Sequence, residues 1–178
     1  QGGFGSQSKF PSVPQLEFLL NEWERTHDDK LREVLTITLD AMARGGLYDH
    51  LGGGFFRYTV DSGWKTPHFE KMLYDNALLA RLYLRAGRVF ARPVYLDVAR
   101  GTLDFMRHEL RVSDGTFIAA LSAVDDKNVE GGFYLFTQTE LEATLTAEEL
   151  RVARLAWSMT DAAGCRCRTS SRPTAATA

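Results

Sequence analysis

The sequence predicts a mostly helical protein in which pairs of helices are separated by short loops rich in glycine and aromatic residues. Apolar residues recur at helical spacing in successive segments of the first 110 residues. A motif of glycine followed by an aromatic or leucine residue recurs between them, at Gly2, Gly45, Asp114 and Gly131. A helix pair with such a loop cannot bury its own apolar face, so the pairs must stack on one another.

Two arrangements satisfy this pattern. In a ring, the helix pairs would form an α/α toroid, with inner helices around a central pocket and the glycine–aromatic loops at one mouth. The alternative is an ordinary helical bundle whose glycines only end helices. We expect an incomplete α/α toroid over residues 1–160, followed by a small, polar and basic tail over 161–178 that shows no sign of folding.

The expected helices, taken in order, span residues 15–26, 28–43, 67–87, 93–110, 140–145 and 148–159. Thr26 and Asp29 resemble a capping box before the second helix. Thr66 is a plausible N-cap for the third helix, and Pro67 occupies its first position. In the fourth helix the predicted buried stripe is Tyr95, Val98, Ala99, Leu103 and Met106.

Residues 114–137 have strand character. Phe117–Ala120 and Phe133–Phe136 predict the two arms of a small β-hairpin across a polar turn.

Composition excludes several classes of function. A net charge of −2 gives no electrostatic basis for binding nucleic acid or an anionic membrane. No apolar run has the roughly 20 residues of a membrane helix. Cys165 and Cys167 lie too close together for a disulfide framework or a zinc site, so we predict a reducing, cytoplasmic setting and neither a metal nor a cofactor.

The stretch from residue 45 to 79 is the predicted functional region, because glycines, aromatic rings and ionisable groups gather there. If residues 67–87 are helical, His68, Lys71 and Asp75 lie within about 60° of one another on an otherwise apolar helix. Such groups must pair or face a wet cavity. His68, Asp75 and Glu70 are therefore the catalytic candidates, as a histidine and carboxylates that could transfer protons. The competing interpretation is a Lys71–Asp75 pair, with His68 bonded to backbone.

The predicted ligand-binding residues are Asp49, His50, Arg57, Tyr58, Trp64, Lys71, Asp125 and Glu130. Trp64, Phe56 and Tyr58 could form a wall for a sugar ring, although aromatic residues more often lie in the core. Asp49, His50 and Arg57 could equally hold the loop together, with Asp49 accepting backbone N–H groups and Arg57 pairing with a carboxylate. Asp125, Asp126 and Glu130 could supply a carboxylate on another side of the pocket, although for Asp126 a solvated turn is favoured.

Four blocks along the chain together resemble a known family. They read GGFGSQSKFPSVP, YDHLGGGFFRYTVDSGWKTPHFEKMLYDNALL, TLDFMRHEL and ALSAVDDKNVEGGFYLFT. This order is similar to that of the spermatogenesis-associated protein 20-like family, which joins an N-terminal thioredoxin-like domain to an α/α six-hairpin toroid. The toroid in turn resembles N-acylglucosamine 2-epimerases and six-hairpin glycosidases.

The resemblance implies a pocket of sugar size and a carbohydrate-active or sugar-binding domain, with epimerase-like or isomerase-like proton transfer as one activity. The alternative function is a non-catalytic scaffold attached to a thioredoxin-like domain. The resemblance also implies that the chain is a fragment, since the thioredoxin-like domain and about half of the toroid helices are not in it. The expected partners are a small sugar-like ligand and these missing parts.

Overall fold

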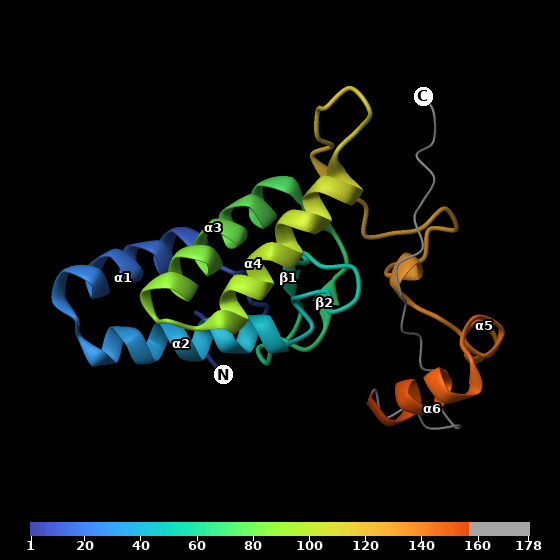
Figure 1. Cartoon of the computed structure of the whole chain (residues 1–178), viewed down its shortest axis with the longest axis horizontal. Helices are drawn as coiled ribbons and strands as arrows, with labels where there is room; N and C mark the ends of the chain where they lie inside the picture. Colours follow the sequence, from blue (N-terminus) through green and yellow to red (C-terminus); the bar gives the residue numbers. More distant parts are fainter. Residues whose placement is uncertain (157–178) are drawn as a thin grey trace. The chain divides into compact units, whose positions relative to one another are not determined.

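Two helical hairpins form the body of the first of two compact units, residues 1–123, in a computed structural model that describes residues 1–156. The first hairpin pairs α1 (Val13–Thr26) with α2 (Asp29–Arg44), and the second pairs α3 (Leu73–Val89) with α4 (Pro93–Phe105). α1 also packs on α3, so the hairpins stack side by side (Figure 1). This stacking is what the repeated helix–helix–loop pattern requires.

The core of this unit lies between the four helices. Its fully buried members include Leu16 and Leu20 of α1, Leu35 and Leu39 of α2, and Tyr83 of α3. The buried hydroxyl of Tyr83 donates a hydrogen bond to the carbonyl of Leu39, so the polar atom of this side chain has a partner in the core.

The helix ends differ in detail from the sequence prediction. Asp28, and not Thr26, caps α2, because its carboxylate accepts the backbone N–H of Lys30 at 2.8 Å. The fourth predicted helix divides into α4 and the short π-helix η1 (Met106–Leu110). Leu103 was expected in the buried stripe of α4 but is 46% exposed.

The largest correction concerns the start of α3, which begins at Leu73 rather than at Pro67. The preceding residues form short strands instead. β2 (Pro67–His68) pairs antiparallel with β1 (Tyr58–Thr59), and β3 (Lys71–Met72) pairs antiparallel with β4 (Ala120–Leu121). Pairing with backbone groups distant in sequence outweighs the local helix signal of Thr66 and Pro67. β1 and β2 lie near the C-terminal end of α2 (Figure 1).

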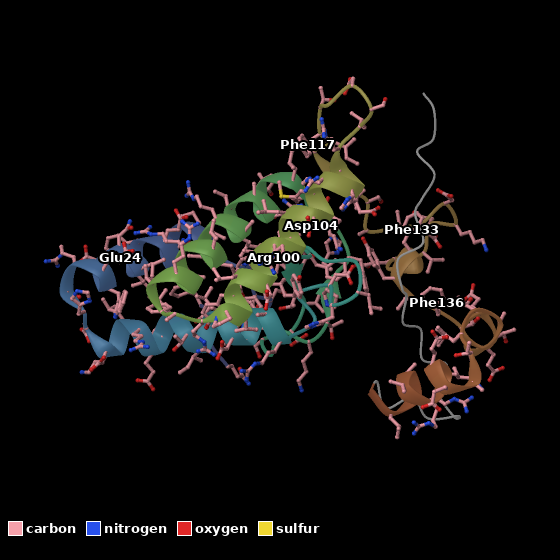
Figure 2. The ribbon with its side chains drawn as sticks, viewed as in Figure 1. Glu24, Arg100, Asp104, Phe117, Phe133 and Phe136 are labelled. Atoms are coloured by element: carbon pink, nitrogen blue, oxygen red, sulfur yellow. The ribbon has the colours of Figure 1, made fainter. Side chains whose placement is uncertain are left out.

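The predicted β-hairpin between Phe117–Ala120 and Phe133–Phe136 is therefore wrong. Ala120 pairs with Met72 of β3, and Phe117 lies on the loop after η1, where its backbone bridges to Arg111 (Figure 2). Phe133 belongs to the 3-10 helix η2 (Gly132–Tyr134) of the second unit.

The second unit begins at Val124 and contains η2, α5 (Gln138–Thr144) and α6 (Ala147–Ala156). Thr137 and Glu140 form a reciprocal capping box at the start of α5. α5 and α6 match the two short helices predicted here. The predicted tail over 161–178 lies outside the described residues, and the single domain over 1–160 stays a prediction.

Candidate functional site

A column of three aromatic rings lies on the strand pair β1–β2. Tyr58 and His68 are cross-strand partners, and their rings stack at 4.8 Å between centroids with 21° between planes. Phe10, from the N-terminal segment, stacks on Tyr58 at 4.7 Å. Directly opposite residues on an antiparallel pair share one face of the sheet, so the pairing of β1 with β2 itself brings these two rings together.

Ionisable groups gather beside this column. Arg57 Nη1 donates to Glu70 Oε2 at 2.7 Å, and His68 Nε2 lies 4.0 Å from the same oxygen. The Arg57 N–H also donates to the Glu70 carbonyl at 2.8 Å, so backbone and side chains hold the two residues together. The side chain of Arg57 is 40% exposed, which leaves the pair within reach of a ligand.

Asp75, in the first turn of α3, completes this group. Burial raises the pKa of its carboxyl from 3.8 to about 6, the positive charge of Arg57 lowers that pKa, and the negative charge of Glu70 raises it further. Asp75 therefore lies within electrostatic reach of both Arg57 and Glu70. We call Arg57, His68, Glu70 and Asp75 the acid–base cluster. It unites the three predicted catalytic residues with one predicted ligand-binding residue, although through strand pairing and not through a helical stripe.

Lys71 lies away from the acid–base cluster, against prediction. Its side chain is 1% exposed, and its Nζ donates to Asp49 Oδ2 at 2.7 Å and to the Gly53 carbonyl at 2.8 Å. The physical reason is the extended backbone, which sends alternate residues to opposite faces. A helix would have placed Lys71 beside His68 and Asp75; the strand does not.

Asp49 and His50 staple the glycine-rich loop. Asp49 Oδ1 accepts the N–H groups of Leu51 and Gly52, at 3.0 and 2.9 Å. His50 Nε2 donates to the Gly45 carbonyl at 3.1 Å. Their contacts match the structural alternative that the sequence left open for this loop, and so does the pairing of Arg57 with the Glu70 carboxylate.

Trp64 is a core residue and does not form an accessible wall. It is 1% exposed, and its indole N–H donates to the Gln1 carbonyl at 3.0 Å. Phe56, the second predicted wall residue, is buried as well, and the third, Tyr58, stacks on His68 of the acid–base cluster.

Asp125 and Glu130 belong to the second unit. The Asp125 carboxylate accepts the N–H groups of Lys127 and Val129, each at 2.9 Å, and Glu130 is an exposed residue whose backbone bridges to Val124. Asp125 thus shapes a turn, and a ligand-binding role for Asp125 and Glu130 stays a prediction.

Three residues of this region were missed. Phe10 ends the aromatic column, and Tyr74 raises the pKa of Arg57 by its charge and a hydrogen bond, after the larger effect of Glu70. Asn76 is fully buried and bonds both backbone groups of Phe55. The run from Tyr58 to Val60 followed by Asp-Ser-Gly is a hairpin signal that would have revealed the strand pair.

Within residues 1–156, no group of three or more His, Cys, Asp or Glu side chains is arranged to hold a metal ion. In the same part of the chain, no helix combines the length and apolar character needed to cross a membrane.

The sequence is similar to part of spermatogenesis-associated protein 20. The mouse and human proteins are each 38% identical over 153 residues, 81% of this chain. An uncharacterized protein of Caenorhabditis elegans, B0495.5, is 36% identical over 168 residues, 86% of this chain. The chain covers 19%, 20% and 23% of these three proteins, or about a fifth of their length. No protein-family model matches it.

The fold is similar to that of sugar epimerases. A cellobiose 2-epimerase from Spirochaeta thermophila superposes with a TM-score of 0.61 at 19% identity, over 68% of this chain and 33% of the epimerase. A sugar epimerase from a ruminal bacterium gives 0.61 at 17% identity, over 88% of this chain and 46% of the other. The chain is thus similar in sequence to one segment of spermatogenesis-associated protein 20, and its fold is that of an incomplete α/α toroid of the 2-epimerase type.

Proposed function

We propose that this chain is the partial toroid of a carbohydrate-active protein, and that its acid–base cluster binds a sugar and transfers protons on it. The observation that carries the proposal is the pairing of Glu70 with Arg57 beside Asp75, whose pKa burial raises to about 6. Two carboxylates in such different surroundings suit the two roles that proton transfer needs. The likeness in fold to sugar epimerases supports the choice of substrate class.

The proposed chemistry is epimerisation next to a carbonyl. In an open-chain reducing sugar, a base removes the proton of the carbon beside the carbonyl, and the electron pair moves toward the carbonyl oxygen. Return of a proton to the opposite face of that carbon gives the epimer. Asp75 with a pKa of about 6 is mostly ionised at neutral pH and can accept a proton, and His68 can donate one.

Arg57 has a supporting role in this proposal. Its guanidinium is partly exposed beside Glu70, so it can stabilise the negative charge that develops on the sugar oxygen. Phe10, the exposed outer ring of the aromatic column, offers a flat apolar surface, and Tyr58 lies between it and His68. A cytoplasmic location also belongs to the proposal and rests on the cysteine pattern alone.

The experiment is solvent exchange in deuterium oxide. The chain is incubated with cellobiose or glucose, and the proton at carbon 2 is followed by NMR. We expect loss of that proton and formation of the epimer, with rates about 100-fold lower in Asp75→Asn and His68→Gln. Asp97→Asn, the same type of change on an exposed ion pair of α4, is the matched control and should keep the wild-type rate. Exchange no faster than in buffer would contradict the proposal.

A non-catalytic scaffold attached to a thioredoxin-like domain is the second candidate. The scaffold is favoured by the structural contacts of two residues that were predicted to bind a ligand. Trp64 is buried in the core, and Asp49 is bonded to Lys71. In that case His68→Gln should leave partner binding nearly unchanged. A sugar that binds without exchange at carbon 2 would favour a binding role over catalysis.

A further inference from the structure

Lys71 is a buried ionisable residue that the proposed proton transfer does not use. Its ammonium group donates to Asp49 and to the Gly53 carbonyl, as described above. It also lies over two aromatic rings, 4.3 Å from the centroid of Phe105 and 4.9 Å from that of Phe56. Burial lowers the pKa of this lysine and the Asp49 charge raises it.

The partners of Lys71 come from two separate parts of the unit. Asp49 and Gly53 belong to the glycine-rich loop, and Phe105 is the last residue of α4, directly before the π-helix η1. The loop packs closely here, because a Cβ on Gly54 would overlap the Phe105 ring. The lysine therefore joins the loop, β3 and the end of α4 at one point.

The residues around Lys71 alternate between two faces. Lys71 is buried on one side, and half-buried Phe69 packs against Phe56 at 5.4 Å between ring centroids. His68 and Glu70 lie on the other side, in the acid–base cluster. In an extended segment, a slip of one residue would exchange the two faces and turn His68 and Glu70 inward.

We propose that Lys71 is a positioning residue for the acid–base cluster, because its anchored ammonium fixes the register in which residues 67–72 present His68 and Glu70 to Arg57. The role of this register in proton transfer rests on the proposed function. The contacts of Lys71 that set the register are independent of that function.

Burying a charged group costs desolvation free energy, and a protein with apolar side chains of similar size in place of a buried ion pair is often equally stable. What the charge adds is direction, since the Nζ must meet Asp49 and the Gly53 carbonyl at defined places. Both residues of β3 also pair with β4 through backbone groups, Lys71 with Leu121 and Met72 with Ala120, but backbone groups recur at every residue and so specify the register less strictly than the side chain of Lys71 does.

The test compares Lys71→Met with a matched control, Arg92→Met. Arg92 also forms a tertiary ion pair, with Asp40 at 3.0 Å, and lies over the Tyr95 ring at 4.8 Å, but it joins the start of α4 to α2. Both variants remove a cation and keep an unbranched side chain. Thermal melting measures the general loss of stability in each.

Two readouts report the cluster itself without any need for turnover. The pKa of Asp75 is measured by NMR titration of its carboxyl carbon, and hydrogen exchange follows the Arg57 amide, which is bonded to the Glu70 carbonyl. In Lys71→Met we expect the Asp75 pKa to fall by about one unit as water enters. The Arg57 amide should exchange at least about 10-fold faster. Arg92→Met should lower the melting temperature and change neither readout.

Unchanged values in a folded Lys71→Met protein would overturn the inference, as would equal changes in Arg92→Met. If Lys71→Met does not fold, Asp49→Asn is measured instead, since it keeps the size of its side chain and removes the negative charge that Lys71 meets. The same two shifts are then expected, and their absence overturns the inference. Because neither readout needs a substrate, failure of the sugar assay would leave this test intact.

Discussion

Asp75 makes the stability of the fold depend on pH in a direction unusual for an aspartate. Burial is the main cause that raises its folded-state pKa from 3.8 to about 6. The folded protein therefore holds this proton more tightly than the unfolded chain does. The stabilisation is fully present below about pH 4, where both states are protonated, and is lost as the pH rises through about 6. Asp75→Asn cannot ionise and should escape that loss.

The magnitude follows from the size of the shift. A shift of about two units corresponds to about 3 kcal/mol between the two protonation states. Asp75 is only about half buried, so solvent screening reduces the effect, and about 1–1.5 kcal/mol is a reasonable expectation. The attraction between ionised Asp75 and Arg57 lowers the pKa of Asp75 and so opposes the effect of burial. The net pKa of about 6 already includes this attraction.

Urea unfolding of wild type and Asp75→Asn at about pH 4 and about pH 7.5 measures this effect. The free energy of unfolding of the variant, relative to wild type, should rise by about 1 kcal/mol between the two pH values. Asp97→Asn, at an exposed position, is the control and should show no such rise. A difference that stays constant with pH, or that falls, would refute the reasoning.

Two further predictions concern the packing that holds the site. Asn76→Leu should cost about 2–4 kcal/mol in denaturant unfolding, because it leaves the buried backbone groups of Phe55 without partners. A loss below about 1 kcal/mol would contradict this. Gly54→Ala should lower stability by about 1–3 kcal/mol, since Gly54 has a φ of +76° and a methyl group would meet the Phe105 ring. Gly63→Ala, at a glycine without positive φ, is the control, and equal melting temperatures for the two variants would argue against the strain.

The helical hairpins could be predicted from sequence because their signals are local. Leu16 and Leu20 recur at helical spacing, and Pro93 occupies the first position of α4. Such features act within one or two turns of helix, so the residues themselves carry the information. The stacking of hairpins followed from the same pattern, since each hairpin leaves an apolar face uncovered.

The strand pairs could not be predicted in the same way. β3 pairs with β4, and Ala120 is distant in sequence from Met72. The predicted partner of Phe117–Ala120 was instead the segment Phe133–Phe136, because both segments have strand character and a polar turn separates them. The spacing of residues within each segment does not indicate that β4 pairs with β3, the strand directly before α3.

The candidate site shows both outcomes in neighbouring residues. His68, Glu70 and Asp75 do come together with Arg57. These residues could be chosen from sequence because few ionisable residues lie so close to one another along this stretch. Lys71 was assigned to the same group by helical phase, and the extended backbone sends it to the interior. An error in secondary structure over a few residues was therefore enough to misplace one side chain.

The most direct test of the proposed sugar site is an NMR titration of the isotope-labelled chain with cellobiose, to about 10 mM, which detects weak millimolar binding. The account predicts saturable shifts concentrated at Tyr58, His68 and Asp75, with weaker binding in Asp75→Asn and unchanged binding in Asp97→Asn. Shifts confined to other surfaces, such as the exposed Phe18 of α1, would contradict it, and so would no saturable shift at all.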